Sequence, residues 1–154
     1  MPKKKKVNQS KWKRNIYYGL LILFFASLAI LFTWPMAQDF NHTLISKYNN
    51  SDGPFFLWNL WWVKESILEL QNPFFTNHVY YPLEANLTLH TLTLTSGLLY
   101  LLVSPLISYV TFLNVLQLIS MILSAIGMIL LVNYLAKPAD YYERLGSVAA
   151  GIIF

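Results

Sequence analysis

A long uncharged run that directly follows a basic segment constrains this chain more than any other feature. Residues 16–34 contain no charged side chain, and seven of the eleven Lys and Arg residues precede Asn15. At about 1.5 Å of rise per residue, a helix over this run would just cross a hydrocarbon core of about 30 Å. Cations are retained on the cytoplasmic side of such a helix. The sequence therefore predicts a basic cytoplasmic tail at 1–15 and a first transmembrane helix at 16–35.

A cleaved signal peptide is the alternative interpretation of the same residues. Signal peptides have apolar cores of about 7–15 residues, followed by a small-x-small cleavage site. Here the apolar core is longer and ends in Trp34-Pro35-Met36, without such a site. We therefore favour a helix that is retained in the mature protein.

The composition is typical of an integral membrane protein. The 154 residues are 56% hydrophobic and 12% charged, with a mean hydropathy of +0.45, whereas soluble domains have about 25% charged residues. The net charge of +4 belongs to the N-terminal segment, because after residue 14 only four Lys and Arg oppose seven Asp and Glu. A nucleic-acid-binding surface is not predicted, since it would need cations spread over a folded face. The chain has no cysteine, which excludes disulfides and thiol chemistry.

A second apolar stretch, residues 91–136, contains no acidic, basic or histidine side chain. It is long enough for one span and a partial one, or for two spans, and Pro105 divides it. One crossing places Lys137 and Arg144 on the cytoplasmic side, as the usual distribution of cations favours, whereas two crossings would place them outside. We therefore favour a single crossing.

A single crossing divides this region into a broken or re-entrant helix at 94–107, a second transmembrane helix at 109–135 and a cytoplasmic loop at 136–146. Irregular backbone at membrane depth must be shielded by protein, so we expect the first of these to pack on other helices. Residues 147–154 then begin a truncated third transmembrane helix, and we expect the chain to be part of a longer polypeptide. Small residues in this last segment favour close packing on another helix: Ser147, Ala149, Ala150 and Gly151.

The polar chemistry of the chain concentrates between the two predicted spans, in an extracytoplasmic loop at 36–93. This loop holds all three histidines and five of the seven acidic residues. Within it, Asp52-Gly53-Pro54 is a typical helix start, and three Trp residues of the kind that settle at the headgroup level follow. The spacing predicts an amphipathic interfacial helix at 55–70, with Asn59, Ser66 and Glu69 on its polar face. The predicted fold is thus an all-α integral membrane protein with an interfacial helix in its outer loop.

Asp52 is the first candidate for chemistry, because it lies where the loop enters the predicted helix. A carboxylate there can act as a general base or bind a divalent cation such as Mg²⁺ or Mn²⁺. Capping of the helix N-terminus is an equally good interpretation. Asp39 lies just past the first span and is a second catalytic candidate, which would converge with Asp52; a solvated loop charge is its alternative.

His90 is a candidate for ligand binding, because an ionisable side chain that enters an apolar region costs free energy. It would hydrogen-bond a phosphate or a sugar, and a capping or interfacial histidine is the alternative. The aromatic side chains of the loop predict either a cover over the helix ends or a groove for a lipid-linked or sugar-bearing ligand. From them we select Trp58, Trp62 and Tyr81 as candidate substrate-binding residues.

Several short motifs occur together after the basic tail and cover nearly all of the remaining chain. They are Asp52-Gly53-Pro54, FLWNLWWV at 56–63, NPFFT at 72–76, YYP at 80–82, Asn86-Leu87 with His90-Thr91, Asn114, and AAGIIF at 149–154. Their order resembles the N-terminal section of polytopic membrane proteins of the GT-C glycosyltransferase type. The resemblance implies a multi-span enzyme that takes a sugar from a polyprenyl-phosphate carrier on the outer face. It also implies an acidic catalytic residue in the first outer loop, a position that Asp52 matches best.

Two hypotheses for the function follow. The first is an N-terminal fragment of a cell-envelope glycosyltransferase, located in the plasma membrane with its N-terminus in the cytoplasm and inactive as a fragment. Its expected partners are membrane lipid and a polyprenyl-phosphate sugar donor, and no nucleic acid. The alternative is a non-catalytic membrane module for lipid binding or complex assembly.

Overall fold

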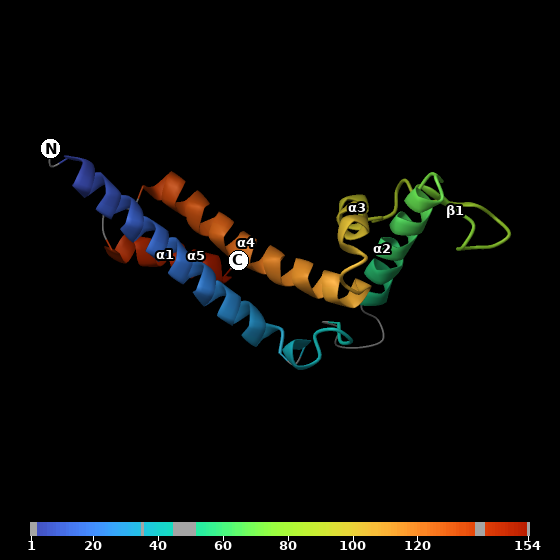
Figure 1. Cartoon of the computed structure of the whole chain (residues 1–154), viewed down its shortest axis with the longest axis horizontal. Coiled ribbons are helices and arrows are strands. Elements are labelled where there is room, and N and C mark those ends of the chain that lie inside the picture. Colours follow the sequence, from blue (N-terminus) through green and yellow to red (C-terminus); the bar gives the residue numbers. More distant parts are fainter. Residues whose placement is uncertain (1–2, 35, 45–51, 138–140, 154) are drawn as a thin grey trace. The chain divides into compact units, whose positions relative to one another are not determined.

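The computed structural model describes residues 3–34, 36–44, 52–137 and 141–153 (Figure 1). The helices are α1 (Lys3–Phe32), the short 3₁₀ helix η1 (Met36–Gln38), α2 (Gly53–Leu68), α3 (Leu94–Val103), α4 (Tyr109–Ala136) and α5 (Tyr141–Ile153). Strands β1 (Phe75–Thr76) and β2 (Ala85–Asn86) pair antiparallel, with Phe75 opposite Asn86. The predicted helical fold is confirmed in these residues, apart from this short strand pair.

The chain divides into two compact units. Unit 1 comprises residues 1–34 and 116–154, and unit 2 comprises residues 35–115. Helix α4 therefore contributes its first residues to unit 2 and the rest to unit 1.

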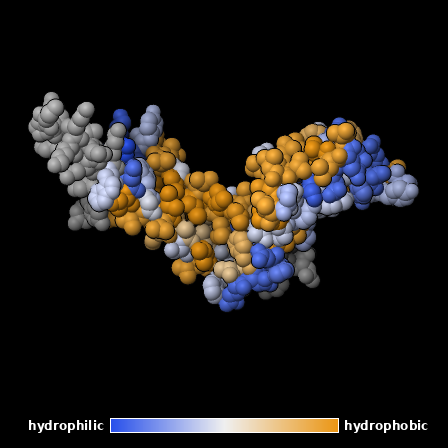
Figure 2. Space-filling model, viewed as in Figure 1, coloured by the Kyte–Doolittle hydropathy of each residue, from blue (hydrophilic) through white to orange (hydrophobic). Residues whose placement is uncertain are grey.

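Among the described residues, two helices are long and apolar enough to cross a membrane: residues Arg14–Phe32 of α1, with a mean hydropathy of 2.1, and α4, with 2.5. Only 17% and 11% of these windows are buried within the chain, and Figure 2 shows hydrophobic side chains over the visible face of α4. Length and composition thus suggest membrane association. Helix α1 ends at Phe32, three residues before the predicted end of the span, because the residue before Pro35 is disfavoured in helical conformation.

In unit 1, α1 and α4 run antiparallel and α5 lies beside both (Figure 1). The core of the unit joins Leu21 and Phe25 of α1 to Ala125 and Ile129 of α4. Helix α5 begins at Tyr141, so the predicted loop at 136–146 is wrong for its last six residues. Glu143 and Arg144 lie in the first turns of this helix, whereas the prediction began the helix only after the charged residues.

Close packing of α5 depends on two small residues one helical turn apart. Ser147 is buried, and its hydroxyl donates to Oδ1 of Asn133 on α4 at 2.7 Å. At Gly151, an added Cβ would lie 2.9 Å from the carbonyl oxygen of Ala125. Small residues let helix backbones approach closely, and the predicted close packing is confirmed for these two positions. Ala149 instead is exposed.

In unit 2, α2 packs against α3. An added Cβ at Gly97 of α3 would lie 2.5 Å from Cβ of Val63, so the two helices approach closely only because residue 97 is glycine. Helix α2 begins and ends two residues earlier than the predicted 55–70. Helix α3 ends at Val103 rather than at 107, since Pro105 has no backbone N–H with which to continue the helical hydrogen bonds.

The predicted polar face of α2 is wrong for two residues. Asn59 and Ser66 are fully buried, together with Leu60 and Val63. The Asn59 amide donates to the carbonyl of Thr91 at 2.8 Å, and the Ser66 hydroxyl donates to the carbonyl of Val63 at 3.0 Å. Buried polar groups are tolerated when they are hydrogen-bonded in this way. The buried side of α2 is therefore mixed in polarity, and apolar residues also lie on its more exposed sides.

The connection between α2 and α3 folds back over α2. The indole N–H of Trp62 donates to the carbonyl of Pro73 at 2.9 Å. The same ring packs with Val63, Leu87 and Leu92 in the core of this unit. This core holds the β1–β2 pair and the residues that follow it against the middle of α2.

Candidate functional site

A pocket of about 410 Å³ lies in unit 2, beside the first turns of α2. We call it the His90 pocket. The ring of His90 stacks on Phe55, with centroids 4.6 Å apart and an angle of 10° between the planes, and lies 6.4 Å from Trp58. The lining residues come from α2, from the β1–β2 connection, from β2 and from the turn that follows it: Phe55, Trp58, Val79, Tyr80, Ala85, Asn86, Leu87 and His90.

His90 supplies the main polar feature of this pocket. Its backbone N–H donates to Leu87 at 3.0 Å, which fixes the position of the ring on its turn. Its Nδ1 is buried and has no hydrogen-bond partner among the residues that the structure describes. A buried polar atom without a partner costs about 1–3 kcal/mol. A ligand that supplies a polar group to Nδ1 would remove that cost.

Asn86 places a second polar group in the pocket wall. Its Oδ1 accepts hydrogen bonds from the backbone N–H of Thr88 at 2.9 Å and from the Thr88 hydroxyl at 2.5 Å. These bonds orient the amide and leave its NH₂ group as the donor that a ligand can use. The pocket therefore combines aromatic walls with two oriented polar side chains.

Asp52 precedes the first residue of α2 and is exposed. Its backbone carbonyl accepts from Phe56 at 2.9 Å, but its side chain makes no capping hydrogen bond. The side-chain hydrogen bond that defines an N-cap is therefore absent at Asp52. Residues three apart share a helix face, so Asp52 lies one turn from Phe55, the ring on which His90 stacks.

The three aromatic candidates differ in position. Trp58 lines the His90 pocket. Trp62 is only 2% exposed and is held by its bond to Pro73, so its ring packs in the core. Tyr81 is 81% exposed and is not among the lining residues, whereas its neighbour Tyr80 is.

A second cavity of about 540 Å³, also in unit 2, has His42 on its rim. We call it the His42 groove. Its lining is Asn41, His42, Leu57, Trp58, Trp61, Ser108, Tyr109 and Val110. Trp58 therefore lines both cavities. The sequence analysis missed His42, although its spacing of three residues from Asp39 is a signal for a paired carboxylate and imidazole.

Asp39 pairs with this histidine in the structure. Its Oδ1 lies 2.7 Å from Nδ1 of His42, and its Oδ2 accepts from the hydroxyl of Thr43 at 3.4 Å. Residues 45–51, which join this turn to Asp52, lie outside the described residues, so the convergence of Asp39 with Asp52 stays a prediction. Within the described ranges, no group of three or more His, Asp or Glu side chains could hold a metal ion. The Mg²⁺ or Mn²⁺ site also stays a prediction.

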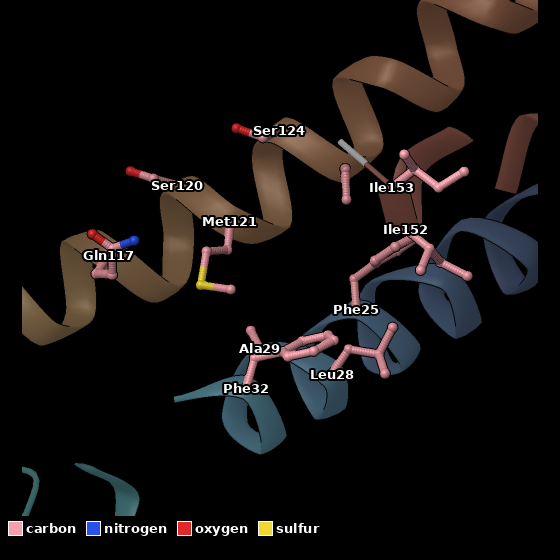
Figure 3. Close-up of a pocket in the computed structure, with 12 residues that line it drawn as sticks. Phe25, Leu28, Ala29, Phe32, Gln117, Ser120, Met121, Ser124, Ile152 and Ile153 are labelled. Atoms are coloured by element: carbon pink, nitrogen blue, oxygen red, sulfur yellow. The ribbon is translucent and has the colours of Figure 1, made fainter. Parts of the chain in front are cut away.

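A third pocket, of about 300 Å³, lies in unit 1 between α1, α4 and α5 (Figure 3). Met121 points from α4 towards α1, and the hydroxyls of Ser120 and Ser124 turn away from α1 (Figure 3). Its lining includes no titratable side chain. This pocket therefore offers no acid–base chemistry, and the two cavities of unit 2 are the candidate site.

Comparison with known proteins finds no matching family model, no matching curated protein and no matching solved structure.

Proposed function

We propose that this protein is part of a membrane glycosyltransferase that takes a sugar from a polyprenyl-phosphate carrier on the extracytoplasmic face. The His90 pocket is the observation that carries the proposal. Its volume lies within the range of about 300–1,000 Å³ that is typical of small-molecule sites, and aromatic walls with a few polar groups are their usual lining. A sugar ring has apolar faces for Phe55 and Trp58, and hydroxyls for His90 and Asn86.

The proposed orientation in the membrane follows from the cations of unit 1. Because α1 and α4 run antiparallel, Arg14 near the start of the first apolar helix and Lys137 after the second lie at the same end of the unit. Cations favour the cytoplasmic side. This distribution of cations supports the proposed cytoplasmic N-terminus in the plasma membrane and a position of residues 36–93 outside, where lipid-linked sugars would reach them.

In the proposed reaction, an acceptor oxygen bonds to the anomeric carbon of the sugar with inversion. The bond from that carbon to the phosphate oxygen breaks, and its electron pair leaves with the polyprenyl phosphate. Asp52 acts either as the base for the acceptor or as a ligand of Mg²⁺ or Mn²⁺ that neutralises the leaving phosphate. Its exposed carboxylate, one turn from Phe55, supports both roles.

The test is transfer of a labelled sugar from a polyprenyl-phosphate donor, in membranes that contain the full-length gene product. Wild type is compared with Asp52→Asn and with Glu84→Gln, which neutralises an exposed carboxylate of the same loop. All three are compared at matched abundance. We expect Asp52→Asn to abolish transfer and Glu84→Gln to retain it. Absence of wild-type transfer from every donor, or equal transfer by Asp52→Asn, would favour the non-catalytic lipid-binding or assembly module.

A further inference from the structure

Asp39 pairs with the imidazole of His42 in an exposed turn, where 54% of the Asp39 side chain and 81% of the His42 side chain are exposed. Its backbone carbonyl accepts from the backbone N–H groups of His42 at 3.2 Å and Thr43 at 2.9 Å, which forms the turn. Its carboxylate accepts the Nδ1–H of His42 at 2.7 Å and, through its second oxygen, the Thr43 hydroxyl. A carboxylate on Nδ1–H fixes the tautomer in which Nε2 is the acceptor. The nitrogen offered to a ligand is therefore a base.

The turn that carries His42 is anchored from the start of α4. Asn114 is buried, and its amide NH₂ group donates to the carbonyls of Phe40 and Thr43, both at 2.8 Å. The hydroxyl of Thr111 donates to Oδ1 of Asn41 at 2.9 Å. These bonds bridge about seventy residues of sequence, with separations of 70 to 74. Binding and catalytic residues often lie on loops that a rigid scaffold positions.

The His42 groove next to this turn is mostly apolar. Its apolar wall is formed by Leu57, Trp58, Trp61 and Val110. The imidazole of His42 is a basic group in the same lining. Besides Asp39, Lys64 is a charged neighbour of the groove; its ammonium lies 5.8 Å from the ring centre of Tyr109 and 3.8 Å from Glu65. Such a lining fits a molecule with an apolar body and a hydroxyl group at one end.

We propose that the His42 groove binds the acceptor, an amphiphilic alcohol, and that His42 is the general base that removes the proton from its hydroxyl. This inference rests on the proposed sugar transfer. As the acceptor oxygen bonds to the anomeric carbon, its proton passes to Nε2 of His42, and the polyprenyl phosphate leaves with the electron pair of the broken bond. Asp39 is a positioning residue that acts through His42. The role of Asp52 is then to bind the cation that neutralises the leaving phosphate.

The experiment measures transfer by the full-length protein in membranes, with wild type and His42→Ala at matched abundance. General base catalysis is typically worth about 10²–10⁴-fold, so we expect kcat to fall by that factor while KM for the donor stays unchanged. Added imidazole should restore part of the activity to His42→Ala, and Tris at the same pH and ionic strength should not. Rescue by a free base is a result that a merely structural role for His42 would not give.

Two further variants separate positioning from folding. Asp39→Asn keeps the shape of the side chain but favours the wrong tautomer of His42, so we expect lower kcat and no rescue by imidazole. Gln38→Ala, an exposed change in the same segment, should retain wild-type transfer. Two results with an active wild type would overturn the role of His42 and leave the proposed function standing. In the first, His42→Ala is as active as wild type; in the second, His42→Ala loses activity that imidazole does not restore. Inactive wild type would overturn both.

Discussion

The contact between α2 and α3 gives the sharpest test of the packing in unit 2. In Gly97→Ala, the new Cβ would lie 2.5 Å from both Cβ and Cγ1 of Val63, and 3.0 Å from its Cγ2. Rotation of the Val63 side chain can move Cγ1 and Cγ2, but Cβ is fixed to the backbone. The separation must therefore grow towards the 3.4 Å at which ordinary contact begins, and this requires the helices to move apart.

Forcing extra carbon into a packed contact typically costs about 1–3 kcal/mol. At about 2–4 °C per kcal/mol for a chain of roughly this length, Gly97→Ala should lower the melting temperature by several degrees. The assay is thermal unfolding of the purified protein in detergent, followed by tryptophan fluorescence, because Trp62 packs in the same core.

The matched control is Gly127→Ala in α4, where an added Cβ has no atom within 4 Å. Replacement of glycine by alanine inside a helix is favourable by about 1 kcal/mol when space allows, so this variant should be at least as stable as wild type. Equal melting temperatures for the two variants would refute the close approach of α2 and α3.

Two other contacts allow similar tests. Ser147→Ala removes the hydroxyl that donates to Asn133 on α4; interhelical bonds of this kind average about 0.6 kcal/mol in membranes, so thermal unfolding in detergent should show a small loss, and a loss above about 2 kcal/mol would contradict that assignment. Asn114→Ala leaves the carbonyls of Phe40 and Thr43 without their donor, at about 1–3 kcal/mol for unpaired buried groups. Limited proteolysis should then cut residues 36–44 faster than in wild type, and unchanged cleavage would mean that Asn114 is not the anchor of this segment.

The helices were predictable where a single local signal decides them. A charge-free run fixes the apolar part of α1 and the body of α4, and Asp52-Gly53-Pro54 marks the start of α2. The ends of the helices differ from the prediction by a few residues. Proline residues end some helices early, and charged residues can form the first turns of a helix that the prediction began later. Helix α5 shows this clearly, since its first turns carry Glu143 and Arg144 within a helix that runs into the apolar segment.

The polarity of α2 could not be predicted from its own residues. Spacing alone places Asn59 and Ser66 on the wet side, because polar side chains usually face water. Asn59 is buried because the carbonyl of Thr91, 32 residues later, accepts from its amide. Gly97 is likewise needed only because Val63 lies against it. Both facts depend on contacts between segments that no local pattern specifies.

The candidate site was predicted in part for the same reason. The sequence indicates His90 as a candidate because this histidine enters an apolar stretch. Its position in the pocket wall, however, depends on its stacking with Phe55. The spacing of three residues between Asp39 and His42 is visible in the sequence. It indicates a site only together with the hydrogen bonds from Asn114 that hold this turn. A single sequence does not reveal residues whose role depends on contacts with residues far away in the chain.

Trp58 connects the two halves of the proposed site, because its side chain lines both the His90 pocket and the His42 groove. Its ring lies nearly parallel to that of Trp62, at 6.3 Å and 15°, and Trp62 is in turn held by its bond to Pro73. The wall between the cavities is therefore backed by the core of unit 2. In a sugar transfer, the donor and the acceptor must meet in a fixed geometry, since orientation supplies much of the rate. A single supported ring that lines both cavities would give the two proposed ligands a common fixed reference.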